Sequence, residues 1–163
     1  MNKTISAEHR AERFSHALYG LIIITATLAA ERLHVERAQD AMGLLIGTAI
    51  VLLLVHTYTE VMAVRSVEGH PLGAVGRRLV VEDNIPVVAS VAVPAATFIL
   101  AGAGTITLAT AYRISIGFCL VALAGLGLYQ GRKSHLGWPK SIISAAAAGA
   151  IGLLMVFVEA TFE

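Results

Sequence analysis

Charged side chains are scarce in this sequence, since Asp, Glu, Lys and Arg make up only 14% of its 163 residues. A soluble domain is about one quarter charged and covers its surface with these residues. Hydrophobic residues account for 56% of the chain, and the mean hydropathy is +0.75. The shortage of charge excludes an ordinary soluble domain and predicts an integral membrane protein.

Cysteine and net basic charge are scarce as well. Cys119 is the single cysteine, so neither an internal disulfide nor a cysteine-based metal motif is possible. The formal net charge of +1 leaves no basic face for phosphates, which argues against a nucleic-acid partner. No nucleophile–base arrangement, phosphate loop or cofactor motif is visible, so we expect neither an enzyme nor a tightly bound cofactor. We expect "GAGT" (102–105) to be a helix end, because it is too short for a dinucleotide fingerprint.

Five long apolar segments are what the chain has instead. Each is long enough, at ~1.5 Å per residue, to cross ~30 Å of hydrocarbon as a helix. The polar amino terminus lacks an apolar core with a cleavage site, so we expect the first segment to be retained. The sequence predicts an all-α polytopic membrane protein with one domain, residues 1–163. The expected spans are 14–30, 41–64, 85–105, 111–130 and 138–160, and the longest loop is expected at 65–83.

The basic residues predict an orientation. Nine flank one side of the expected spans and three flank the other. The positive-inside rule then places the amino terminus in the cytoplasm and the carboxyl terminus outside. We expect a bacterial-type plasma membrane, with an organellar membrane as the alternative. The nine are Lys3, Arg10, Arg13, Arg65, Arg77, Arg78, Arg132, Lys133 and Lys140; the three are Arg32, Arg37 and Arg113.

Aromatic and small residues mark particular faces. Tyr112, Tyr129 and Trp138 lie at expected span ends, where amphipathic rings favour the headgroup region.

The fifth span repeats small residues at a spacing of four, and the fourth span is rich in glycine, which lets helices approach closely in lipid. Such faces predict either a homodimer interface or tight packing within one subunit. The small residues are Ala145, Ala148, Gly149 and Gly152 in the fifth span, and Gly117, Gly125, Gly127 and Gly131 in the fourth.

Five ionisable residues are expected to converge near the cytoplasmic side. His56 and Glu60 lie four residues apart on one face of the second span. His16 is near the cytoplasmic end of the first span, and Glu82 and Asp83 precede the third. Imidazole and carboxylate together suit iron(II), manganese(II) or zinc, and they equally suit a proton relay. The five residues are therefore our candidate metal ligands.

A purely structural interpretation stands beside this one. His56 and Glu60 could satisfy each other, while His16 and the acidic pair could lie in the headgroup region. For Glu60 we favour a function, because a carboxylate in a span is costly to keep without one. Glu31 and Glu159, at the expected outer ends of spans, are expected to be solvated.

Several motifs resemble the vacuolar iron transporter family. "TEVMAVRSVEG" (59–69) resembles the end of its second helix, so that Glu60 falls on the family's membrane glutamate and Arg65 and Ser66 on its basic-Ser pair. "GLGLYQGRKSHLGWPKSIISAAAAGAIG" (125–152) is similar to its fourth-to-fifth helix hairpin, and "YGL" (19–21) to the start of its first-helix motif. The resemblance implies five spans with the same topology, and a dimer that exports divalent metal ions in exchange for protons.

The sequence also departs from that family. Ile22, Ile23 and Ile24 stand where the first-helix motif continues with Asn-Asp-Gly, so the membrane aspartate is missing. His56 occupies the place of a methionine. The long acidic cytoplasmic insertion is reduced to the loop at 65–83.

These observations lead to three functional hypotheses. The first is a small dimeric transporter of a divalent cation or protons, in which Glu60 binds the cation, His56 is a second ligand or proton carrier, and His16 assists. The second is a non-transporting scaffold or accessory subunit that packs against partner helices through its Gly/Ala faces. The third is a small cation channel, because "RFSHALYGLIIIT" (13–25) resembles the Phe-Ser-Asp motif of one potassium-channel family, with His16 in place of the aspartate. Membrane lipid surrounds the protein in all three.

Overall fold

The computed structural model describes residues 2–68, 74–134 and 137–162. Within these ranges, side chains are described except at 2–13, 33, 67–68, 74–81, 83, 86–87, 159–160 and 162. The described chain is helical and contains no strand, which confirms the predicted all-α class for this part of the protein. Its helices are α1 (Asn2–His34), α2 (Ala38–Glu68), α3 (Ala74–Gly102), α4 (Leu108–Lys133) and α5 (Trp138–Phe162).

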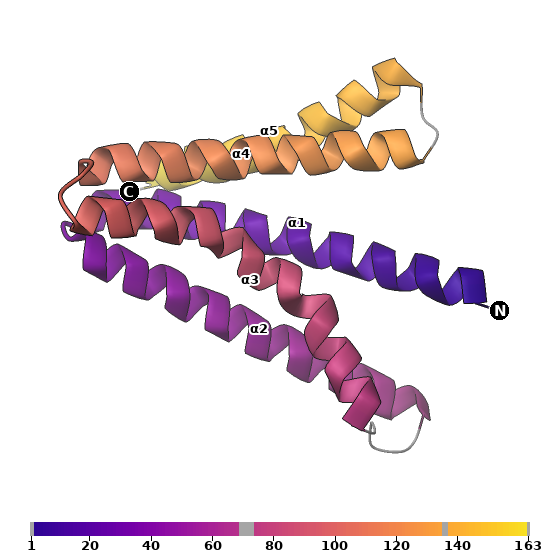
Figure 1. Ribbon diagram of the computed structural model, residues 1–163. Helices are drawn as coiled ribbons and strands as arrows, with labels where there is room; N and C mark the ends of the chain where they lie inside the picture. Colours follow the sequence, from indigo (N-terminus) through magenta and orange to yellow (C-terminus); the bar gives the residue numbers. More distant parts are fainter. Residues whose placement is uncertain (1, 69–73, 135–136, 163) are drawn as a thin grey trace.

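The helices run up and down in one bundle (Figure 1). One end of the bundle, which we call the N-terminal end, carries the start of α1, the end of α2, the start of α3, the end of α4 and the start of α5. The opposite, C-terminal end carries the end of α1, the start of α2, the end of α3 and the start of α4. The first helix contacts all four others. It therefore forms the centre of the bundle.

Four of the described helices are long and apolar enough to cross a membrane: Phe14–Arg32 in α1, Ala38–Ser66 in α2, Leu108–Lys133 in α4 and Trp138–Val158 in α5. In α3 the apolar part whose side chains are described is Val88–Gly102, and the sequence is already apolar from Ile85. Large apolar side chains point outward, as in Val121 and Phe157, which are 73% and 66% exposed. Apolar helices with apolar outer faces are compatible with a multi-pass integral membrane protein.

Two helix boundaries differ from the prediction. The expected loop at 65–83 was wrong, because α2 continues to Glu68 and α3 begins at Ala74; the breakers Gly69, Pro71 and Gly73 lie outside the described residues. The third span was expected to reach residue 105, but α3 ends at Gly102. Gly104 adopts a φ of 75°, its N–H donates to Ala101 O, and the N–H of residue 105 donates to the carbonyl of residue 100. This pair of bonds is the Schellman motif, which ends a helix at a left-handed glycine.

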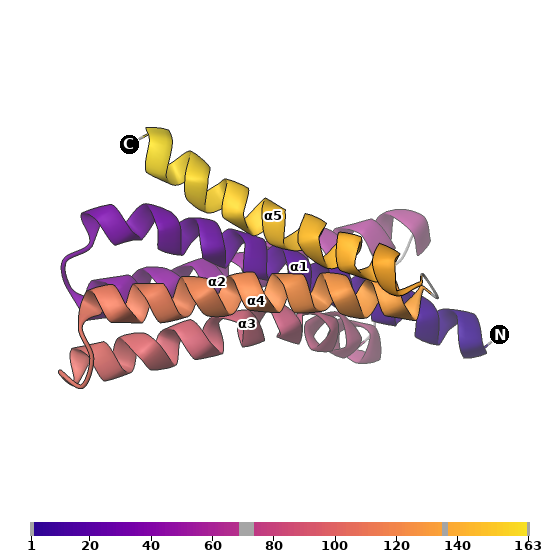
Figure 2. The ribbon, with the colours of Figure 1, turned by 90° about the horizontal axis from the view of Figure 1, so that it is seen from above.

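The small-residue faces of α4 and α5 pack against each other, and the two helices cross at an angle (Figure 2). A Cβ atom on Gly127 would lie 2.6 Å from the backbone oxygen of Ser144, and one on Gly131 would lie 2.7 Å from Ser141 Cα. On α5, a Cβ on Gly152 would lie 2.7 Å from a Leu120 methyl group. At these three glycines the helices pack closely within one chain, as one of the two predictions expects.

Buried polar side chains gather between α1, α3 and α4. The hydroxyl groups of Thr97 and Ser115 lie 2.6 Å apart across α3 and α4, and Thr25 on α1 donates to Leu21 O at 2.6 Å. Apolar residues fill the rest of this interface. The described polar side chains that are buried are Thr25, Glu31, Asn84, Ser90, Thr97, Ser115 and Ser141, and all but Ser141 belong to these three helices.

Candidate cation site

His56 on α2 lies against two rings of α1. The His16 ring meets it edge-on, with ring centroids 5.3 Å apart and planes at 80°. The Tyr19 ring centroid is 4.9 Å from that of His56, with planes at 57°. Residues three apart share a helix face, so His16 and Tyr19 reach the same partner. The structure thus brings together the two histidines that the sequence singled out.

The hydrogen bonding of His56 determines which ring nitrogen can take a ligand. Its Nδ1 lies 2.9 Å from Leu52 O, one turn earlier on the same helix. A carbonyl oxygen can only accept, so Nδ1 carries the hydrogen in this contact. In the neutral ring Nε2 then keeps its lone pair, which is the group that binds a proton or a metal ion.

Glu60 is held by an amide on the neighbouring helix. Asn84 Nδ2 donates to Glu60 Oε2 at 3.0 Å, joining α2 to α3. Asn84 is fully buried, whereas Glu60 is partly exposed. A hydrogen bond to a carboxylate is stronger than one between neutral groups and fixes the oxygen that accepts it. Asn84 therefore positions Glu60 while leaving it accessible.

The acidic pair that precedes the third apolar segment lies within α3 and not in a loop. Glu82 is partly exposed, and the side chain of Asp83 lies outside the described residues. Among the side chains that the structure describes, no group of three or more His, Cys, Asp or Glu could hold a metal ion. The described candidates instead take part in two pairs, His16 with His56, and Glu60 with Asn84, which was not a candidate.

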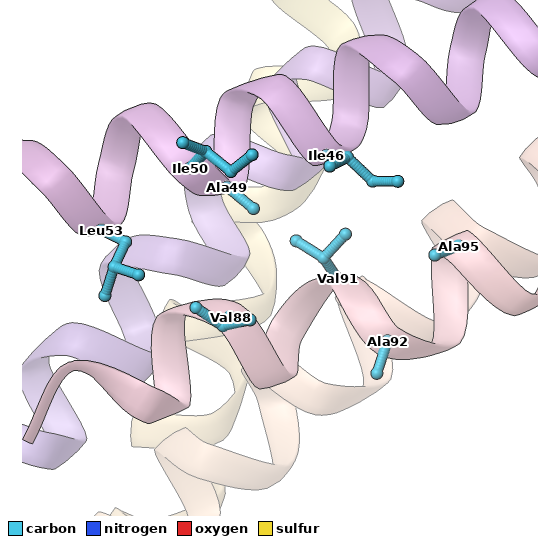
Figure 3. A pocket seen from close by; sticks show the side chains of 8 residues that line it. All are labelled: Ile46, Ala49, Ile50, Leu53, Val88, Val91, Ala92 and Ala95. Atoms are coloured by element: carbon cyan, nitrogen blue, oxygen red, sulfur yellow. The ribbon is translucent and has the colours of Figure 1, made fainter. Parts of the chain in front are cut away.

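An apolar groove lies on the other part of the α2–α3 interface. It has a volume of about 310 Å³ and is lined by residues such as Ile46, Ile50, Leu53, Val88 and Ala95 (Figure 3). Its eight lining side chains are all hydrocarbon, so it offers no ligand to a cation. The groove therefore contributes no ligand to the candidate cation site.

Two residues at the C-terminal end of the bundle differ from expectation. Glu31 was expected to be solvated but is only 7% exposed, because it lies inside α1, which continues to His34 within the bundle. Tyr112 was expected in the headgroup region but is 1% exposed, with its ring edge-on to Phe98 at 4.9 Å. Tyr129 and Trp138 are 56% and 61% exposed. Glu159 has its side chain outside the described residues.

Asn84 is the member of the site that sequence reasoning missed. It follows Glu82 and Asp83 directly, and those charges draw attention first. The available signal was a polar amide at the start of an apolar segment, a residue type that must find a partner once it is buried. Only the packing of α3 on α2 identifies Glu60 as that partner.

Comparisons with protein-family models, curated proteins and solved structures find no match to this chain. The resemblance to vacuolar iron transporters therefore depends on the quoted motifs, and the assignment of a function depends on the two polar pairs.

Proposed function

We propose that this protein is a small membrane transport protein that moves a cation, either a proton or a divalent metal ion. The observation that carries the proposal is the pairing of His16 with His56 and of Glu60 with Asn84 inside apolar helices. Ionisable groups within membrane helices are costly, and in most cases they mark ion pathways. Glu60 supplies the negative charge and His56 supplies a second group that binds a proton or a metal ion.

The geometry favours the proton. Glu60 and His56 can each take a proton singly, whereas a transition metal ion prefers several ligands at once. A metal ion is the second candidate, because the two imidazoles have ring centroids 5.3 Å apart and His56 lies one turn from Glu60. Imidazole and carboxylate are ligand types that iron(II), manganese(II) and zinc accept, although the described side chains do not form a group of three ligands. A metal ion would then be the transported substrate and not a resident cofactor.

The proposal includes five crossings with the N-terminal end of the bundle in the cytoplasm. The chain directions of the helices support a crossing by α3. Both α2 and α4 run toward the N-terminal end, so α3, which connects them, runs back across the membrane (Figure 1). Support for the orientation comes from the nine basic residues that flank that end. His16, His56 and Glu60 would then be reached from the cytoplasm.

Flux measurements in proteoliposomes test the proposal. Wild type is compared with Glu60→Gln and His56→Ala, using an internal pH dye under a potassium-driven voltage and, separately, Mn²⁺ influx. We expect Glu60→Gln to lower the flux of the transported ion by roughly tenfold or more, since even indirect partners of metal ligands cost that much when changed. The matched controls are Glu36→Gln and His34→Ala, because both residues are exposed at the other end of the bundle.

Each outcome has a distinct meaning. Loss of proton flux alone identifies the proton as the cargo, and loss of both fluxes indicates that proton and metal share the site. Equal flux from wild type and Glu60→Gln removes Glu60 from the pathway. Wild-type flux no greater than that of empty liposomes refutes transport and leaves the accessory-subunit hypothesis.

A further inference from the structure

Two arginines from different helices line one cavity at the C-terminal end of the bundle. Arg32 lies in the last turn of α1 and Arg113 in the second turn of α4, and both side chains are exposed. The cavity has a volume of about 400 Å³ and is also lined by Tyr112. Within the described part of the chain, neither guanidinium group forms a hydrogen bond or an ion pair. The two positive charges at this cavity are therefore available to a ligand.

The described lining of the cavity contains no acidic side chain that could neutralise these arginines. Its other members are Val35, Leu108 and Ala109. Glu31 precedes Arg32 in the sequence, but it is buried and does not belong to this lining. Two guanidinium groups in one cavity attract an anion and repel a cation. The chemistry of this end of the bundle is therefore opposite to that of the candidate cation site.

Two further features of the cavity suit an anion that carries oxygen atoms. Leu108 and Ala109 belong to the first turn of α4, where free backbone N–H groups and the helix dipole favour negative charge. Tyr112 is only 1% exposed, and its hydroxyl oxygen has no hydrogen-bond partner in the described part of the chain. A buried hydroxyl without a partner is costly, and an anionic oxygen is the kind of acceptor that it lacks.

The position of the cavity along the helices suits a lipid headgroup. The apolar part of α1 ends at Arg32 and that of α4 begins at Leu108, so the cavity lies where both helices leave the apolar region. In a bundle that spans a membrane, this is the level of the phospholipid headgroups. Arginine binds phosphate through two parallel hydrogen bonds. An anionic lipid suits the cavity better than a zwitterionic one, because the guanidinium groups repel a cationic headgroup.

We propose that this cavity binds the phosphate group of an anionic phospholipid, and that Arg32 and Arg113 are its charged ligands. The acyl chains of the lipid then lie along the apolar outer faces of the helices. The inference does not depend on the proposed transport, because it concerns the opposite end of the bundle and is tested by lipid binding without a flux.

Native mass spectrometry of the full chain tests the site. Protein in detergent is titrated with phosphatidylglycerol and separately with phosphatidylcholine, and the lipid that stays bound is counted. We expect wild type to bind phosphatidylglycerol more tightly than phosphatidylcholine. The double variant Arg32→Gln with Arg113→Gln is expected to weaken phosphatidylglycerol binding by roughly tenfold or more, since a hydrogen bond to a charged group contributes about that factor.

Arg37→Gln is the matched control. Arg37 is an exposed arginine at the same end of the bundle, but it does not belong to the described lining of the cavity. The substitution removes the same charge at nearly the same level and is expected to leave lipid binding unchanged. An equal loss in Arg37→Gln, or equal affinity of wild type for the two lipids, would show that general surface charge binds the lipid and would overturn the proposal.

Two more arms keep the test decisive. Inorganic phosphate is expected not to displace phosphatidylglycerol from wild type, and displacement would identify a soluble anion as the ligand and overturn the assignment to lipid. Arg32→Lys with Arg113→Lys covers the case in which the glutamine variant fails to fold, because it keeps both charges. This variant lacks the paired donors of arginine, so it is expected to bind severalfold more weakly than wild type. Wild-type affinity in the lysine variant would contradict phosphate binding by the two arginines.

Discussion

At the scale of single residues, the hydrogen bond from Asn84 to Glu60 is the contact on which the candidate site depends most. A buried amide is costly without a partner, and a carboxylate in an apolar helix is costly without a donor. The 3.0 Å bond gives the amide nitrogen an acceptor and the carboxylate a donor. It also ties α3 to α2 at the level of the site, so the position of Glu60 is set by a neighbouring helix and not by α2 alone.

A double-mutant cycle measures this bond. Asn84→Ala and Glu60→Ala are each expected to destabilise the protein, and the double variant is expected to lose less than their sum. Interhelical hydrogen bonds in membrane proteins contribute ~0.6 kcal/mol on average and up to ~1.7 kcal/mol, so we expect a coupling energy in this range. Reversible unfolding in bicelles provides the free energies. Strict additivity would show that the two side chains do not interact in the membrane.

Residue-level sequence reasoning succeeded and failed for identifiable reasons. Helical spacing placed His56 and Glu60 on one face of one helix. Glu31 was mispredicted because a charge at the end of an apolar run usually meets water, and the sequence does not show how the helices pack around that position. The predicted headgroup position of Tyr112 was wrong for the same reason, since the rotation of a helix decides in which direction a ring points. Neighbouring helices decide both cases.

At the scale of elements, the glycines of α4 differ from one another in what they contact. Gly127 and Gly131 lie against the backbone of α5, whereas Gly117 and Gly125 have nothing within 4 Å of a Cβ position. Composition alone could not separate the two groups, because all four share one glycine-rich helix. A homodimer interface through the open pair stays a prediction.

Substitutions at two of these glycines test the distinction. Gly127→Ala is expected to destabilise the protein by roughly 1–3 kcal/mol, because the new methyl group meets a backbone oxygen that cannot move aside. Gly125→Ala carries the same gain in helix propensity without the clash and is expected to be neutral or slightly stabilising. Thermal unfolding of both variants in one detergent gives the comparison. Equal effects would contradict the packing of α4 on α5.

Helices were predicted better than their ends. Each expected span falls within an observed helix apart from residues 103–105, because apolar length is a strong signal. The start of α3 was missed, since Gly73, Gly76 and Pro71 are typical of a loop, yet the helix begins at Ala74 and includes Gly76. Helix propensity is a weak signal that the rest of the bundle overrides.

At the scale of the whole molecule, the proposed orientation is open to direct measurement. Cys119 is fully buried, so a membrane-impermeant maleimide is not expected to reach the native thiol, and the wild type serves as the blank. Glu36→Cys and Ser134→Cys each add one thiol at an exposed position, on opposite ends of the bundle. A membrane-impermeant maleimide is expected to label the first in intact cells and the second only after permeabilisation. The reverse pattern would invert the proposed topology.

The bond between Asn84 and Glu60 has a consequence for how an ion would reach the carboxylate. Asn84 comes directly before the apolar run of α3, which begins at Ile85, so the bond lies where this helix changes from polar to apolar. In the proposed orientation this change faces the cytoplasmic headgroup layer. An ion would then meet the carboxylate at the edge of the hydrocarbon region, without any helix having to open.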